Sequence, residues 1–180
     1  MSQIILISGS PSENSSSDKV LDYIGSLLTD EGHLVEKINV TDIPAKDLMY
    51  GRFDSESIKK VTKKIEQAQG IVMSSPVYKA SYPGVLKALL DVLPKDSFQH
   101  KTVFPVMLGG SPNHLLAIEY ALKPLIAILK GNSINGVYIL NDQVNKELNF
   151  PIIDEKISER INIQLAYFRD ALNEKKISTF

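Results

Sequence analysis

The stretch ILISGSPSENSSSDKV, residues Ile5–Val20, joins an apolar run to a glycine and a cluster of serines. The apolar run Ile4–Ile7 has the length and composition of a buried strand, and an amphipathic segment follows the serines. Small residues between a buried strand and a helix are typical of loops that hold a phosphate at a helix N-terminus. A simpler interpretation also fits, in which Ser15 or Ser17 only caps the helix.

Four further apolar runs resemble the first in length and in their content of Ile and Val. They are Leu34–Val40, Gly70–Met73, Thr102–Leu108 and Gly136–Leu140. Pro105 weakens the prediction for the run that contains it, because proline has no N–H for a strand ladder. Together the runs predict five strands, most of them buried on both faces.

Five segments between and after these runs carry apolar side chains at helical spacing. They are residues 20–28, 58–68, 85–93, 115–129 and 157–172. Gly32 is expected to end the first helix and Pro94 the third. Strands that alternate with helices are typical of a parallel sheet covered on both faces. The length of the chain favours a flavodoxin-like, doubly wound α/β fold with five parallel strands in the order 2-1-3-4-5.

Length and composition indicate one domain over residues 1–173, with residues 174–180 as a tail. The charges are balanced, with 20 Lys+Arg and 21 Asp+Glu, which gives no support to a nucleic-acid partner. The chain has no cysteine, and no cluster of histidines and carboxylates indicates a metal site. The first residues have no signal-peptide pattern and no run is long enough to cross a membrane, so we expect a cytoplasmic protein.

Ligands of such a sheet bind at the carboxyl ends of its strands, next to the switch point. For this strand order the relevant loops are the first loop (residues 8–17), the second loop (residues 75–84) and the third loop (residues 109–114). In the first loop, Gly9 lets the backbone turn, and serine hydroxyls with helix N–H groups can hold a phosphate.

The second and third loops have the composition of a surface for a flat ring. Two prolines fix the second loop and its two tyrosines offer flat surfaces, so a heteroaromatic ring could lie against residues 76–78. Adjacent glycines in the third loop allow close approach by such a ring. The alternatives are a surface turn whose tyrosines pack on neighbours and a plain flexible turn.

Motifs for other chemistry are missing from these loops. There is no Gly-Lys-Ser/Thr of a P-loop, no G-x-G-x-x-G, and neither a carboxylate pair nor a Ser/His/Asp set. We therefore expect a site that holds a cofactor with its own chemistry, and we predict no catalytic residue.

Four segments carry a resemblance to a known family: SGSPSENSSSDKVLDYI, LMYGRFDS, SSPVYKASYPGVLKALLDVLP and GGSPNHLLAIEYALKPLIAILK. Over residues 4–143 the chain resembles the NADPH-dependent FMN reductases of the alkanesulfonate-utilisation type. The resemblance implies a flavodoxin-like fold and reduction of FMN by NADPH or NADH. It also implies that reduced flavin passes to a partner flavin-dependent monooxygenase that cleaves sulfonates.

The resemblance assigns three groups of binding residues. It implies Ser10, Ser15 and Ser17 for the FMN phosphate, Pro76, Val77, Tyr78 and Lys79 for the isoalloxazine ring, and Gly109, Gly110 and Ser111 for the far side of that ring. The family commonly has an arginine where this chain has Ser16. The phosphate site therefore lacks a bidentate charge contact, and we expect weaker FMN binding.

Tyr120 and Pro124 predict an irregular helix. Pro124 has no N–H for the carbonyl of Tyr120, so the helix must kink or widen there. An ordinary proline kink satisfies this pattern. The resemblance instead implies a π-helical turn at a subunit interface near the flavin, in a homo-tetramer or homodimer.

Two other functions fit the same loops. One is a quinone or azo reductase that retains its FMN, and the other is a flavodoxin-like electron carrier, although a net charge of −1 is far from the acidic surface usual for carriers. For the 2′-phosphate of NADPH, the candidate cations are Lys19, Arg52 and Lys79.

Overall fold

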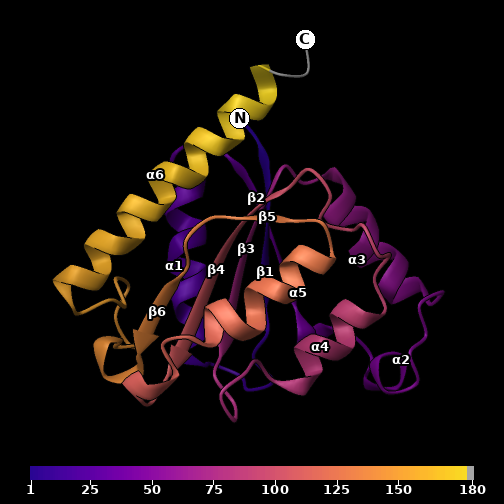
Figure 1. Cartoon of the computed structure of the whole chain (residues 1–180), viewed down its shortest axis with the longest axis horizontal. Helices are drawn as coiled ribbons and strands as arrows, with labels where there is room; N and C mark the ends of the chain where they lie inside the picture. Colours follow the sequence, from indigo (N-terminus) through magenta and orange to yellow (C-terminus); the bar gives the residue numbers. More distant parts are fainter. Residues whose placement is uncertain (178–180) are drawn as a thin grey trace.

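A parallel sheet forms the centre of the computed structural model, which describes residues 1–177, with side chains as far as Glu174 (Figure 1). The strands are β1 (Gln3–Ser8), β2 (Leu34–Asn39), β3 (Gly70–Pro76), β4 (Thr102–Gly109), β5 (Asn132–Ser133) and β6 (Val137–Leu140). The order is β2-β1-β3-β4, and both β5 and β6 pair with the outer edge of β4. The predicted order 2-1-3-4-5 is confirmed, except that two short strands share the fifth position.

Pro105 explains why the fifth position is split. The carbonyl of Val103 accepts a hydrogen bond of 3.0 Å from the N–H of Ile134, so Val103 and then Pro105 face the outer edge of β4. Pro105 has no N–H to donate there. The edge chain leaves the ladder opposite it, and pairing resumes between Val106 and Val137.

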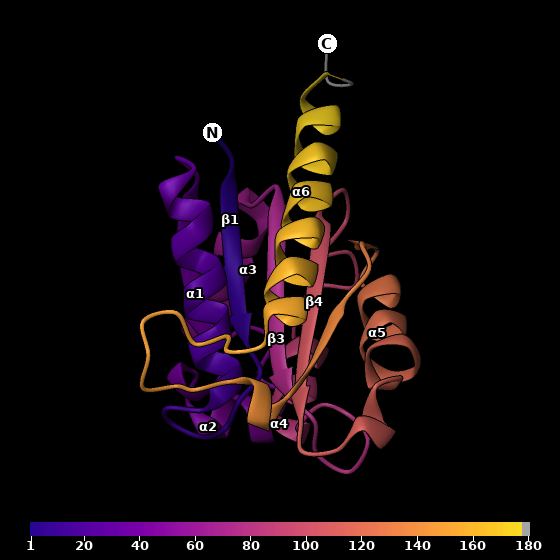
Figure 2. The ribbon, with the colours of Figure 1, turned by 90° about the vertical axis from the view of Figure 1, so that its left-hand side faces the viewer.

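Helices cover both faces of the sheet. They are α1 (Ser16–Asp30), α2 (Ala45–Met49), α3 (Glu56–Gln67), α4 (Gly84–Asp91), α5 (Lys123–Ile128) and α6 (Glu155–Ile177). Figures 1 and 2 show α1 and α6 on one face and α3, α4 and α5 on the other. Gly32, with φ of 82°, follows the end of α1 as predicted. Among the described residues, no helix is both long and apolar enough to span a membrane.

The helices differ from the expected ones in two places. Helix α2 was not predicted, because five residues are too few to show a helical period. The tail expected from Glu174 onward is helical as far as Ile177, because α6 continues through it, and residues 178–180 lie outside the described part of the chain.

Alternation along the strands produces two apolar layers. Ile5, Ile71 and Met107 point to the layer under α3, α4 and α5. Ile4 and Val72 point to the other layer, under α1 and α6. All five side chains are fully buried, so the inner strands have no solvated face and ligands can reach only the ends of the strands.

Lys101 joins the sheet to the end of α3. The side chain is 7% exposed, and its Nζ donates to the carbonyl oxygens of Glu66 (3.2 Å) and Ala68 (3.0 Å). Glu66 lies in the last turn of α3 and Ala68 is its C-cap, where no further helical N–H can reach the carbonyls. Burial lowers the pKa of Lys101, and the ammonium is held by the two carbonyls and the negative end of the helix.

We expect Lys101→Met to lower the free energy of unfolding by about 1–2 kcal/mol, because one buried and one part-buried carbonyl lose their donor. Urea denaturation measures this change. The matched control is Lys95→Met, in the exposed segment after α4, which should change stability little. Equal effects of the two substitutions would contradict the role given to Lys101.

Candidate functional site

The three predicted loops meet at one edge of the sheet. Strand pairing places Ser8 beside Ser74 and Pro76 beside Leu108. The N–H of Gly9 donates to the carbonyl of Ser74 (2.8 Å), which continues the ladder into the first loop. The N–H of Val77 donates to the carbonyl of Leu108 (2.7 Å), which joins the second loop to β4. The loops after β1, β3 and β4 therefore form one continuous surface.

Serine hydroxyls gather at the start of α1. Ser15 is the N-cap, and its Oγ accepts from the N–H of Asp18 (3.1 Å) and lies 3.0 Å from the Oγ of Ser17. Ser10 and Ser17 are almost fully buried. The Oγ of Ser10 bonds both the carbonyl and the N–H of Ser12, each at 3.2 Å. The capping interpretation of Ser15 is thus correct, and it does not exclude a second role.

The residues of the first loop fit a phosphate group. The first N–H groups of a helix have no partner inside it, and they carry the positive end of the helix dipole. Helix α1 has 15 residues, so its dipole is fully developed. The hydroxyls of Ser15 and Ser17 lie at this helix end, Ser10 lies in the loop before it, and each hydroxyl can turn its O–H toward an anionic oxygen.

The second loop is a tight turn held in an uncommon conformation. Tyr78 and Ser81 exchange two backbone hydrogen bonds of 2.7 and 3.1 Å across it. The central residues Lys79 and Ala80 have φ of 50° and 65°, which L-residues rarely adopt. Strain of this kind persists where the surroundings enforce it, often at binding sites. Val77 is partly buried and Tyr78 is 46% exposed, so the loop presents a fixed and accessible edge.

Tyr138 organises the third loop. Its Oη donates to the carbonyl of Ser111 at 2.6 Å, and burial raises the pKa of this phenol. A Cβ on Gly109 would overlap the Tyr138 hydroxyl, whereas a Cβ on Gly110 would meet only Asn141, at 3.7 Å. Gly109 thus makes room for the tyrosine, and Gly110 leaves the surface open.

We expect Gly109→Ala to cost about 1–3 kcal/mol of stability, because the added methyl must displace the Tyr138 ring. In a Tyr138→Phe background the same substitution should cost less, because the overlapping oxygen is gone. Urea denaturation of the two single variants and the double variant measures this coupling. Gly110→Ala is the control, because open space around Gly110 accommodates the added methyl and stability should change little. Strictly additive effects of Gly109→Ala and Tyr138→Phe would contradict the packing argument.

The irregular helix is a π-helical turn over Ile118–Leu122. The N–H of Lys123 donates to the carbonyl of Ile118, five residues earlier, and α5 then begins with Pro124 near its first position. The missing N–H of Pro124 is thus accommodated by a wider turn and not by a simple kink. Tyr120 is 80% exposed and points away from the core.

The three candidate cations for the NADPH 2′-phosphate lie in different surroundings. Arg52 lies 3.7 Å from the carboxylate of Asp47, and its guanidinium stacks over the ring of Tyr50. Lys79 is exposed in the second loop, and Lys19 lines a polar hollow beside Ser15. Only Lys79 belongs to the surface that the three loops form.

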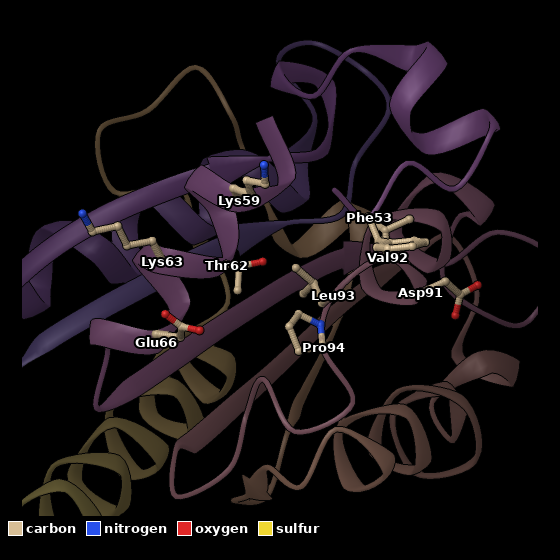
Figure 3. Close-up of a pocket in the computed structure, with 9 residues that line it drawn as sticks. All are labelled: Phe53, Lys59, Thr62, Lys63, Glu66, Asp91, Val92, Leu93 and Pro94. Carbon is tan, nitrogen blue, oxygen red and sulfur yellow. The ribbon is translucent and has the colours of Figure 1, made fainter. Parts of the chain in front are cut away.

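A separate hollow of about 660 Å³ lies between α3 and the end of α4 (Figure 3). It is lined by Lys59, Thr62, Lys63 and Glu66 on one side, and by Phe53 and residues 91–94 on the other. No residue of the three loops takes part, so this hollow is not part of the candidate site.

Sequence reasoning missed Ser74 and Tyr138, which hold the loops in place. Ser74 follows an apolar run directly, and a polar residue at a buried strand end was a usable signal. Tyr138 alternates with apolar residues in β6 and gave no signal of its own, because its partner Ser111 lies 27 positions away.

The chain is similar in sequence and in fold to known flavin reductases. The sequence profile of the family described as NADPH-dependent FMN reductase matches residues 2–146. An FMN reductase (NADPH) of Escherichia coli (strain K12) is 37% identical over 97% of this chain and 92% of its own length. An FMN reductase (NADPH) of Pseudomonas putida is 40% identical over 94% of this chain and 87% of its own. The crystal structure of apo NADH:FMN oxidoreductase (EMOB) superposes with a TM-score of 0.81 at 28% identity, covering 99% of this chain and 90% of that one.

A flavodoxin-like sheet with its binding loops at the switch point is found in a class of flavin-binding proteins that includes flavodoxin. Within that class, the chain belongs to the NADPH-dependent FMN reductase family. FMN and a nicotinamide nucleotide are therefore the flavin and the reductant of this enzyme family.

Proposed function

We propose that this chain reduces FMN with NADPH or NADH and releases the reduced flavin to a partner flavin-dependent monooxygenase of sulfonate utilisation. The observation that carries the proposal is the buried serine cluster at the start of α1, beside two loops with exposed edges. Such a surface can hold a phosphate at one end and a flat ring at the other. Similarity to FMN reductases along most of the chain supports this interpretation.

In this proposal Ser10, Ser15 and Ser17 hold the FMN phosphate. Their hydroxyls and the first N–H groups of α1 replace water around the anion, and the helix dipole stabilises its charge. Ser10 and Ser17 are buried, so their orientation is fixed before the ligand arrives.

The isoalloxazine ring would lie on the second and third loops. Pro76, Val77, Tyr78 and Lys79 would line one side, and the strained turn at Lys79 fixes the backbone groups that face the ring. Gly109, Gly110 and Ser111 would support the far side, with Ser111 held by Tyr138. Gly110 has open space in front of it, which a flat ring can occupy.

A bound flavin would supply the chemistry, as acceptor at N5 of a hydride from C4 of the nicotinamide, with the accompanying proton from solvent. The chain's residues would bind the two rings, orient them toward each other and exclude water from between them. No side chain of the three loops needs to act as acid or base. Lys79 is the exposed cation best placed for the nicotinamide nucleotide.

The direct test is oxidation of NADPH and NADH by flavin-stripped protein at rising FMN concentration. Saturable turnover, with reduced flavin leaving the protein, is the expected result. Turnover only with retained FMN and an added quinone or azo dye would favour the rival reductase. Flavin binding without any nicotinamide oxidation would favour the electron carrier.

Ser10→Ala should weaken FMN binding by about tenfold, because a buried hydroxyl near a phosphate is lost. Riboflavin lacks the phosphate, so its dissociation constant should stay within about twofold. Quenching of flavin fluorescence measures both constants. Equal weakening for the two flavins would mean that Ser10 only shapes the loop.

We also propose that the π-helical turn lies at a subunit interface of a homodimer or homo-tetramer. Large apolar side chains are exposed around it: Leu115, Leu116, Tyr120 and Ile128. Exposed apolar side chains gathered on one surface are typical of interaction sites.

Tyr120→Glu should therefore lower the molecular mass measured by sedimentation, because a charge at the interface separates the subunits. Tyr167→Glu, at an exposed tyrosine of α6, is the matched control and should leave the mass unchanged.

A further inference from the structure

The segment between β6 and α6 extends across the carboxyl ends of the strands as far as α1 (Figure 2). We call residues 143–153 the strap. Figure 2 shows it as the orange loop that extends past α6 to the side of α1. Its residue Lys146 contacts the first loop: the Nζ lies 3.5 Å from the carbonyl oxygen of Asn14, next to the N-cap Ser15.

The strap is held firmly at both ends. Gln143 and Ile153 are joined by a backbone hydrogen bond of 3.0 Å, and Asn145 and Pro151 by one of 2.8 Å. Near its tip, Phe150 packs edge-on against Tyr23 of α1, with ring centroids 6.1 Å apart. The backbone at Lys146 is therefore held by the fold, and its exposed side chain extends from a fixed point.

Lys146 and Ser15 line the same polar hollow of about 320 Å³. Asp18 and Asp22 also line it, but Lys37 lies 2.8 and 2.7 Å from their carboxylates. Burial opposes the charge of Lys37, but the two ion pairs outweigh it and raise the pKa of this side chain. Lys37 thus offsets one of the two carboxylate charges before an anion approaches.

Two other charged residues share the hollow. Glu147 is an exposed carboxylate, and its N–H is bonded to the side chain of Asn145. Lys19 lies in the first turns of α1. Lys146 itself makes no ion pair within the part of the chain that the structure describes, so its charge is available to a ligand.

We propose that Lys146 supplies the cationic contact to the FMN phosphate that Ser16 cannot supply. The inference rests on the proposed function, because it takes the start of α1 as the phosphate site. A cation delivered from the strap, far away in sequence, would compensate for the missing arginine. Being a lysine, it would act as a point charge and not as a bidentate partner.

The experiment compares dissociation constants for FMN and riboflavin, measured by fluorescence quenching. Lys146→Gln should weaken FMN binding by about five- to tenfold, as for a partly exposed charge-assisted hydrogen bond. Riboflavin binding should not change. Adding Ser16→Arg to Lys146→Gln should restore most of the lost affinity, because the arginine returns a cation to the same helix end. Lys60→Gln, at an exposed lysine of α3, is the matched control.

Three outcomes would overturn the inference. They are an unchanged FMN constant in Lys146→Gln, an equal loss for FMN and riboflavin, and a loss in Lys19→Gln in place of Lys146→Gln. If wild-type protein binds riboflavin as tightly as FMN, the phosphate site itself is wrong, and the proposed function fails at that point. If Ser10→Ala lowers FMN affinity selectively and Lys146→Gln does not, only the role of Lys146 fails.

Discussion

Ser74 fastens the first loop to the sheet, and the candidate site depends on this one residue. Its carbonyl accepts from the N–H of Gly9, and its hydroxyl donates to the carbonyl of Ser17 at 2.8 Å. Both groups are buried, where an unpaired polar atom is costly. The two bonds fix where α1 begins relative to β3. The serine cluster and the first N–H groups of α1 keep their places for that reason.

The backbones of the second and third loops are also held in place, each by its own hydrogen bonds. Rigid loops of this kind suit a site without a catalytic side chain. The turn at Lys79 and Ala80 is strained, and the hydrogen bonds between Tyr78 and Ser81 hold it. Tyr138 holds the third loop from behind. When a cofactor provides the reactivity, the protein contributes by fixing geometry in advance, and rigid loops do this at the lowest entropic cost on binding.

The sequence predicts the sheet well, because buried strands are apolar along their whole length and leave a local signal. The same is true of the loops, because the strand order dictates which strand ends meet. Features that depend on contacts between residues far apart in the sequence leave no local signal, so they cannot be predicted in this way. Tyr138 acts on Ser111, and Lys146 reaches Asn14 across 132 positions. Pro124 alone predicts only an irregular helix, and the family resemblance was needed to specify a π-helical turn.

The split of the fifth sheet position at Pro105 also affects whether another chain can add a strand to this edge of the sheet. A sheet edge is a template on which another chain can add a strand, and long regular edges lead to aggregation. Here the outer edge consists of β5, with two residues, and β6, with four, separated by a segment that leaves the ladder. An approaching strand finds no long run of unpaired groups to copy. The proline that is unfavourable for a regular strand thus leaves this side of the sheet without a long, regular edge.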